Sequence, residues 1–119
     1  MEKQAHMRGA LGEVRAEQEL ASRGYRILAR NYRVRGAEID LVAEDRDVVV
    51  FVEVKLRGGG ALGREAVTAA KRRRICRGAM HYMMKNGLTD RQARFDVMEI
   101  QGESVTYIED AFAYQGPAF

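Results

Sequence analysis

The chain has 119 residues, of which 46% are hydrophobic and 31% charged, and its formal net charge is +3. These values are typical of a single globular domain, expected here over residues 1–119, and they exclude a disordered chain. The longest apolar run, Val48–Val52, is too short for a membrane span, and the single cysteine, Cys76, excludes an internal disulfide, so we expect a cytoplasmic protein with no membrane partner.

A helix is expected first, over residues 4–23, because Gly24 can adopt the left-handed conformation that ends a helix. Alternation of apolar and polar residues then predicts strands over residues 24–33 and 37–44. A third strand, over residues 48–57, follows a short turn and is expected to form a β-hairpin with the second.

The third strand is apolar on both faces from residue 48 to 52, and one face becomes charged only near its end, at Glu53 and Lys55. Side chains two apart in a strand point to the same face, so these two share one side. A strand that is apolar on both faces is typical of the centre of a sheet, and we therefore expect helices on both sides of it.

A second helix is expected over residues 62–85, after a flexible break at Gly58–Gly60 and before an end at Asn86–Gly87. Two further strands follow, over residues 93–102 and 104–112. The complete order is αβββαββ, which predicts an α/β fold with a mixed five-stranded sheet flanked by helices.

The basic residues are unevenly distributed, because all 20 lysines and arginines lie within residues 1–98 and four acidic residues follow without any. The densest cluster consists of Lys71, Arg72, Arg73, Arg74 and Arg77, and a second consists of Arg30, Arg33 and Arg35. Such clusters suit a phosphate backbone, whose contacts are mostly electrostatic. Charge runs alone favour the simpler interpretation of a solvated helix face.

Within the second strand, strict alternation places Asp40 and Val42 on one face and Ile39 on the other. The expected hairpin brings Asp40 beside Glu53. Two carboxylates placed together repel each other, and a hard divalent cation with oxygen ligands relieves the repulsion. For Glu53 taken alone, a same-face ion pair with Lys55 is the simpler interpretation.

The first helix adds two carboxylates, Glu13 and Glu17, that project among its apolar positions. At 3.6 residues per turn, the inward side consists of Ala10, Leu11, Val14, Leu20 and Ala21. A carboxylate on an inward stripe must be paired with a cation, protonated or bound to a metal. For Glu17 an ion pair with an arginine of the sheet is the favoured interpretation.

The order of these features resembles the PD-(D/E)xK nuclease superfamily: a helical acid, the pair Gly24–Tyr25, a strand that carries an aspartate, and a hairpin into the letters EVK. Within it the chain is similar to the archaeal Holliday-junction resolvases. Residues 12–57 and the later segments EAVTAAKRRRI and RFDVMEI resemble the bacterial YraN family of endonuclease-like proteins. The resemblance covers roughly residues 9–100 and implies a restriction-endonuclease-like fold.

The resemblance also implies roles for single residues. Asp40 and Glu53, with the backbone carbonyl of Val54, would bind Mg²⁺ or Mn²⁺. Lys55 would position or activate the attacking water, and Glu13 would supply the helical acid of the catalytic set. The expected nucleic-acid-binding residues are Arg33, Arg35, Arg57, Lys71, Arg72, Arg73 and Arg74.

The function implied by the resemblance is a divalent-metal-dependent DNA endonuclease, with branched or otherwise structured DNA as the candidate substrate. Two alternatives stay open: a nucleic-acid-binding module on the same fold, and a protein-interaction scaffold without salt-dependent affinity for DNA. The methionines at positions 80, 83 and 84 are interpreted as core residues or as a patch that pairs in a homodimer.

Overall fold

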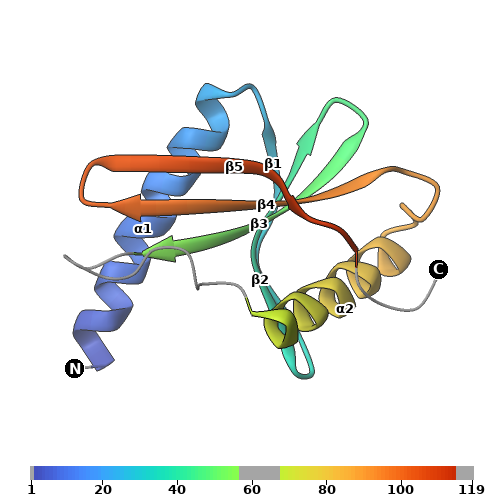
Figure 1. Cartoon of the computed structure of the whole chain (residues 1–119), viewed down its shortest axis with the longest axis horizontal. Helices are drawn as coiled ribbons and strands as arrows, with labels where there is room; N and C mark the ends of the chain where they lie inside the picture. The colour runs from blue at the N-terminus through green and yellow to red at the C-terminus, as the bar shows by residue number, and fades with distance from the viewer. Residues whose placement is uncertain (1, 57–67, 115–119) are drawn as a thin grey trace.

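Two helices and five strands make up the described part of the chain (Figure 1). The structure is a computed structural model that describes residues 2–56 and 68–114, with side chains described from residue 12 onward. In chain order the elements are α1 (Glu2–Ser22), β1 (Arg26–Val34), β2 (Ala37–Asp45), β3 (Val48–Leu56), α2 (Ala69–Lys85), β4 (Ala93–Gln101) and β5 (Ser104–Phe112). This order confirms the expected αβββαββ pattern.

All five strands belong to one sheet in the order β1-β2-β3-β4-β5. Neighbouring strands are antiparallel except β3 and β4, which run parallel. A parallel pair cannot be joined by a tight hairpin, and the chain segment that contains α2 makes the crossover between these two strands. The expected α/β fold with a mixed five-stranded sheet is therefore confirmed.

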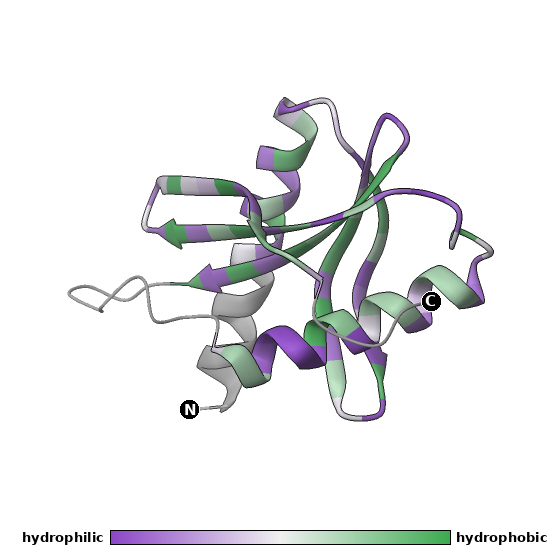
Figure 2. Cartoon of the chain, turned by 45° about the vertical axis from the view of Figure 1, so that its right-hand side comes forward, coloured by the Kyte–Doolittle hydropathy of each residue, from purple (hydrophilic) through white to green (hydrophobic). Residues whose placement is uncertain are grey.

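Each face of the sheet is covered by one helix, as the apolar run of β3 predicted. α2 packs on the face that carries Phe51 and Phe95. α1 packs on the opposite face, where Ala16 and Leu20 join the core that contains Val50. Figure 2 shows the hydrophobic residues concentrated along the central strands. β3 contributes buried side chains to both cores, as β2 and β4 also do, so the three central strands separate the two helices.

The stripe of α1 that faces the sheet is narrower than the sequence indicated. Ala16 and Leu20, four residues apart, are fully buried, whereas Val14 is 56% exposed and Ala21 is exposed as well. The expectation that Val14 and Ala21 face inward is therefore wrong. At 3.6 residues per turn, Val14 lies about 200° around the helix from Ala16, on the far side of the contact with the sheet. The other two residues expected there, 10–11, lie outside the described side chains.

α2 begins at Ala69, and residues 62–67 of the span predicted for this helix lie outside the described residues. Thr68 has an extended backbone (φ −68°, ψ 165°), and its hydroxyl accepts a hydrogen bond from the Lys71 N–H at 3.2 Å. A hydroxyl in this position satisfies a backbone donor that the first turn of a helix leaves unpaired, so Thr68 is the N-cap. The predicted break at Gly58–Gly60 lies outside the described residues.

Both helices end where glycine predicts an end. α1 stops at Ser22 and is followed by Gly24 with φ +82°, and α2 stops at Lys85 and is followed by Gly87 with φ +66°. Glycine adopts this left-handed conformation without steric cost, which makes it a frequent helix terminator. Within the described residues, neither helix combines the length and the apolar character that crossing a membrane requires.

Alternation in β2 is interrupted at Asp40. Ile39 and Val42 pack together in the core beneath α2, whereas Leu41 packs in the core beneath α1. The expectation that Ile39 and Val42 point to opposite faces is therefore wrong. The pairing of β2 with β3 begins at Leu41, opposite Val52. One residue before it, at Asp40, the side-chain Oδ2 accepts a hydrogen bond from the Val54 N–H at 2.7 Å. A carboxylate continues the contact where the backbone ladder stops, and this breaks the regular pleat.

Candidate active site

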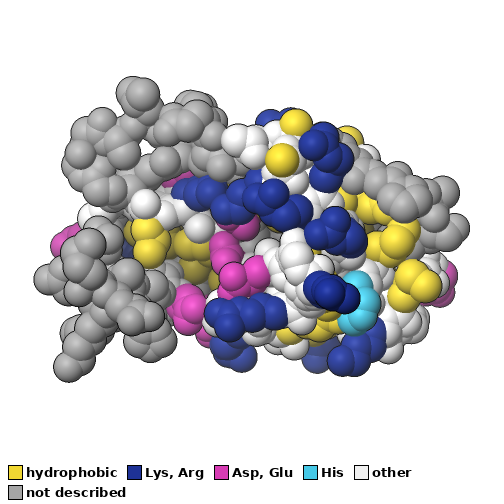
Figure 3. Space-filling model, turned by 90° about the horizontal axis from the view of Figure 1, so that it is seen from below, with side chains coloured by type: hydrophobic (Ala, Val, Ile, Leu, Met, Phe, Trp, Pro, Cys, Tyr) yellow, Lys and Arg dark blue, Asp and Glu magenta, His cyan; other side chains and the backbone are white. Residues whose placement is uncertain are grey.

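A pocket of about 420 Å³ opens beside the interrupted part of β2, between the β1–β2 hairpin and the first turns of α2. On this side of the molecule, acidic side chains lie between two groups of lysine and arginine side chains (Figure 3). The lining residues are Arg33, Val34, Gly36, Ala37, Glu38, Asp40, Glu53, Lys71, Arg74 and Ile75. The pocket thus joins two predicted metal ligands from separate strands with three of the predicted nucleic-acid-binding residues.

Asp40 and Glu53 form the acidic part of the pocket. Glu53 is buried, with 6% of its surface exposed, and Asp40 is half-buried. Burial, and then the negative charge of Glu53, raise the pKa of Asp40 from 3.8 to about 7, although the hydrogen bond from the Val54 N–H favours the charged form. Burial and the nearby Glu53 carboxylate thus disfavour the ionised form of Asp40, and a cation bound close to Asp40 would favour it.

Two lysines approach the same oxygen of Glu53. Lys71 Nζ lies 2.6 Å from Glu53 Oε2, and Lys55 Nζ lies 3.3 Å from it. The ion pair between Glu53 and Lys55, the simpler interpretation of their spacing, is therefore present. Burial and the neighbouring Lys71 lower the pKa of Lys55, against the attraction of Glu53. For Lys71, burial is outweighed by the ion pair with Glu53, and its pKa is raised.

Glu13 is not brought to this pair. Its Oε1 accepts a hydrogen bond from Asn31 Nδ2 at 2.9 Å, on the face of the sheet that α1 covers. Among the described residues, no three His, Cys, Asp or Glu side chains lie close enough together to hold a metal ion. Glu17 forms the predicted ion pair with the sheet, accepting two hydrogen bonds from Arg30 at 2.8 and 2.9 Å. Each acid of α1 therefore has a partner on β1: Arg30 for Glu17, and Asn31 for Glu13.

Three of the predicted basic residues, Arg33, Lys71 and Arg74, line the pocket. Arg33 and Lys71 come from opposite sides of it, one from β1 and the other from α2. Arg33 is held by an ion pair between its Nε and Glu38 Oε2 at 3.1 Å. The pocket therefore has cations on both of its sides, an arrangement that suits an extended anion lying across the opening.

The remaining predicted basic residues lie outside the pocket lining. Arg35 and Arg73 are exposed. Arg72 is half-buried, with its guanidinium carbon 5.4 Å from the centre of the Phe112 ring. Arg57 lies outside the described residues. The sequence cluster is thus divided in space, and Arg72 packs on the sheet and does not line the pocket.

Sequence reasoning missed two residues that shape the pocket. Glu38 lines it and adds negative charge near Asp40. The spacing of two residues between them was a usable signal. Arg77 donates from Nη2 to the Gly36 carbonyl at 2.9 Å and so ties α2 to the turn between β1 and β2. Nothing local in the sequence indicated that contact, because its partners lie 41 residues apart.

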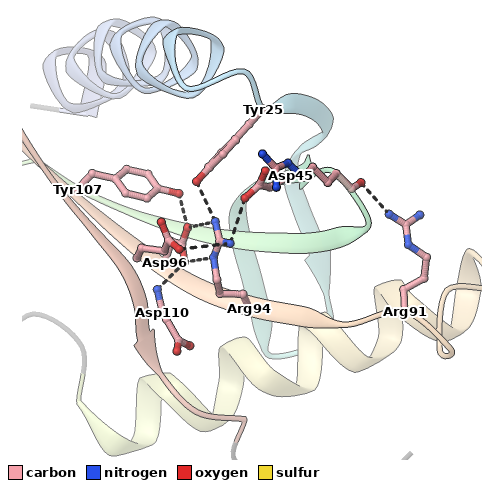
Figure 4. A network of polar contacts seen from close by, with 9 residues as sticks. Tyr25, Asp45, Arg91, Arg94, Asp96, Tyr107 and Asp110 are labelled. Atoms are coloured by element: carbon pink, nitrogen blue, oxygen red, sulfur yellow. Dashed lines mark hydrogen bonds and ion pairs between the residues drawn. The ribbon is translucent and has the colours of Figure 1, made fainter.

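A second polar cluster, also missed, surrounds Asp96 on the face that α1 covers (Figure 4). Arg94 donates from Nε and Nη2 to the two oxygens of Asp96, each at 3.0 Å. The Tyr107 hydroxyl and the Asp110 N–H complete the set, so each oxygen accepts two hydrogen bonds. Burial and Asp96 raise the pKa of Tyr107, and the bonds to Asp96 raise the pKa of Arg94 against the effect of burial. The spacing of Arg94 and Asp96 in β4 was the available signal.

The pocket contains the donor set that a hard divalent cation uses. Mg²⁺ is commonly held by one or two carboxylates and completes its octahedral shell with water and substrate phosphate. Asp40 and Glu53 supply two carboxylates from adjacent strands, and a cation bound there would favour the ionised form of Asp40, whose pKa burial and Glu53 raise. The residues present therefore fit a Mg²⁺ or Mn²⁺ ion bound by two protein side chains, without a contribution from Glu13.

Comparison with known proteins finds one family whose members this chain resembles over most of its length. The sequence model of the uncharacterised protein family UPF0102 matches residues 12–100, which include the whole pocket lining. A UPF0102 protein of Desulforapulum autotrophicum is 43% identical over 118 residues, covering 94% of this chain and 98% of that protein. A UPF0102 protein of Symbiobacterium thermophilum is 50% identical over 95 residues, covering 78% and 80%. A UPF0102 protein of Persephonella marina is 38% identical over 108 residues, covering 89% and 93%.

Proposed function

We propose, from the premise that the chain belongs to the YraN-like UPF0102 family, that it is a divalent-metal-dependent endonuclease that hydrolyses phosphodiester bonds in DNA. Membership of the PD-(D/E)xK nuclease superfamily is part of the proposal. The observation that supports it most is the pair of carboxylates, Asp40 and Glu53, which repel each other in a pocket with cations on both sides. Two buried carboxylates cost the folded state stability, so a pair without a function would be more stable if apolar residues replaced it.

Nucleic acid is the substrate class that suits the charges around the pocket. Arg33 and Arg74 would contact phosphates on either side of the scissile bond, and the exposed Arg35 and Arg73 would extend the contact. Such contacts are electrostatic and independent of base sequence, so affinity should fall steeply as salt rises. Recognition of branched or otherwise structured DNA would then depend on the shape of the phosphate backbone.

Asp40 and Glu53 would hold Mg²⁺ or Mn²⁺, together with the Val54 carbonyl that the resemblance implies. A cation bound there would supply Lewis-acid activation of the scissile phosphate and of the attacking water. The Val54 N–H keeps Asp40 turned into the pocket through its 2.7 Å hydrogen bond. Burial of Glu53 fixes the second carboxylate, so both are positioned before any substrate arrives.

Lys55 would act on the attacking water. It lies on the same face of β3 as Glu53, and its lowered pKa brings its neutral form closer to the working pH. A neutral lysine can accept a proton from water, and its ammonium form can offset charge on the phosphate. Displacement at phosphorus by water then needs no covalent enzyme intermediate.

A nucleic-acid-binding module is the second candidate, and one observation favours it. Glu53 already has two lysine partners, and Glu13 is bonded to Asn31 outside the pocket. A site whose charges are met in this way could hold DNA without cutting it. The two candidates share the basic rim and differ only in what Asp40 and Lys55 do.

The test is a cleavage assay with Mg²⁺ or Mn²⁺ on duplex, single-stranded, flapped, nicked and four-way-junction DNA. Cutting should require metal and should be lost in Asp40→Asn and Lys55→Ala. Asp47→Asn and Lys85→Ala are matched controls, because both side chains are exposed and lie outside the pocket lining. Salt-dependent binding without cutting, unchanged in all four variants, would favour the binding module. Cutting that survives in Asp40→Asn would place the activity elsewhere.

A further inference from the structure

Lys71 is held in the pocket by two constraints of different stiffness. Its backbone is fixed, because the Lys71 N–H donates to the Thr68 hydroxyl that caps α2. Its side chain has four rotatable bonds and reaches Glu53 Oε2 with its ammonium group at 2.6 Å. The position of the ammonium group is therefore set by the attraction of Glu53 and not by the helix.

The two lysines on Glu53 differ in their freedom to leave. Lys55 stands on the same strand as Glu53, two residues away, and only 17% of its side chain is exposed. Lys71 stands on a separate element at the mouth of the pocket, and 34% of its side chain is exposed. Lys71 can therefore turn outward toward solvent without any change in the backbone, whereas Lys55 stays on the same face of β3 as its partner.

We propose that Lys71 is an internal placeholder for the metal: it neutralises Glu53 in the metal-free protein, and a divalent cation displaces it toward the substrate. This deepens the proposed function and rests on metal binding by Asp40 and Glu53. An ammonium group and a divalent cation compete for the same carboxylate oxygen, so both cannot hold it at full strength. In this exchange the ammonium group of Lys71, which neutralises Glu53, is replaced by a metal ion of higher charge.

The side of α2 that carries Lys71 has a second cation near the pocket. Arg74 lies three residues further along α2, on the same side of the helix, and lines the same pocket. A Lys71 side chain released from Glu53 joins Arg74 on the rim and faces a bound phosphate. Metal binding thereby adds a phosphate contact, so the cation and the nucleic acid should strengthen each other's binding.

The first measurement is calorimetric titration of the full chain with Mn²⁺, without DNA. Lys71→Met should bind Mn²⁺ roughly tenfold more tightly than the wild type, since the metal no longer competes with an ammonium group for Glu53. Lys85→Met, which removes an exposed lysine from the other end of α2, should leave the affinity unchanged. Asp40→Asn should weaken it strongly.

Lysine acetylation, read by mass spectrometry, then follows Lys71 in the wild-type chain. Saturating Mn²⁺ should speed acetylation of Lys71 several-fold, because an amine released from Glu53 is more accessible to the reagent, and Lys85 should not respond. This readout separates displacement from simple charge repulsion, in which Lys71 would stay on Glu53. It also decides the matter should Lys71→Met fail to fold.

Each outcome bears on the proposal. Mn²⁺ binding to the wild type with no gain in Lys71→Met, or with unchanged acetylation of Lys71, would overturn the placeholder and leave the proposed metal site standing. Absence of Mn²⁺ binding at millimolar concentration, or binding that survives in Asp40→Asn, would overturn both. Tighter binding together with faster acetylation supports both.

Discussion

Two acid–base pairs with the same spacing lie on neighbouring strands, and their surroundings differ. Glu53 and Lys55 on β3 point toward α2, whereas Arg94 and Asp96 on β4 point toward α1. Asp96 is fully buried and accepts four hydrogen bonds. For Asp40 in the pocket, by contrast, burial and then the negative charge of Glu53 raise the pKa, and the hydrogen bond from the Val54 N–H does not offset them.

The difference distinguishes a cluster that stabilises the fold, around Asp96, from a pocket that can bind a ligand, at Asp40 and Glu53. A buried carboxylate whose oxygens are all satisfied stabilises the native state and has no capacity left for a ligand. Two neighbouring carboxylates in a pocket, where burial and repulsion disfavour the ionised form, cost stability and are available to bind a cation. The cluster around Asp96 therefore joins β4 to β5, and the pocket is where chemistry is expected.

The largest effect should come from breaking the satisfied cluster. Asp96→Ala leaves the Arg94 guanidinium without its two-oxygen partner in a mostly buried position. We expect a loss of about 3 kcal/mol in the free energy of unfolding, measured by urea denaturation. Asp110→Asn is the control, because it keeps the N–H that bonds Asp96 and because asparagine tolerates the positive φ of this residue. Equal stability of the two variants would contradict the comparison.

Neutralising Asp40 should act in the opposite direction. Because the pKa of Asp40 is raised to about 7, the folded state holds the proton more tightly than the unfolded state. The stability that this provides is fully present below about pH 4 and is lost as the pH rises through about 7. In metal-free protein above pH 7, Asp40→Asn should therefore be more stable than wild type by on the order of 2 kcal/mol.

The measurement for Asp40 is urea denaturation of both proteins in chelator from pH 4 to 8.5. The difference between them should grow with pH, and Asp47→Asn should track the wild type. A constant difference across this range would show that the pKa of Asp40 is not raised in the folded protein.

A divalent cation should stabilise the wild type and leave Asp40→Asn almost unchanged. At a free metal concentration of ten times Kd, mass action adds about 1.4 kcal/mol to the free energy of unfolding. The thermal midpoint with Mg²⁺, Mn²⁺ or chelator measures this. Asp110→Asn should respond to metal as the wild type does, because Asp110 contacts the other cluster. A response retained in Asp40→Asn would remove the pocket from consideration as the metal site.

The smallest effect should come from removing one hydrogen bond from the cluster around Asp96 without changing its net charge. Tyr107→Phe removes one of the four hydrogen bonds to Asp96, and the expected cost is about 1 kcal/mol. Metal response and DNA cleavage should stay at the wild-type level. A change in cleavage without a change in stability would show that the two clusters are coupled across the sheet.

Much of the fold and part of the site could be predicted, because they depend on local patterns. Alternation in β2 and β3 indicated a hairpin that brings Asp40 beside Glu53, and the inward position of Glu17 indicated an arginine partner. The N-cap of α2 was not predicted, since it depends on a single hydroxyl, that of Thr68. Strict alternation also failed beside Asp40, where a side chain takes over from the backbone ladder.

By itself the sequence determined the element order, the central position of β3 and the meeting of two acids, since periodicity and turn residues act between near neighbours. Only the tertiary structure decided that Glu13 bonds Asn31, that Lys71 reaches Glu53, and that Tyr107 and Asp110 donate to Asp96. Those contacts join separate elements of the fold. Their geometry follows from how the two helices pack on opposite faces of one sheet, which no local pattern encodes.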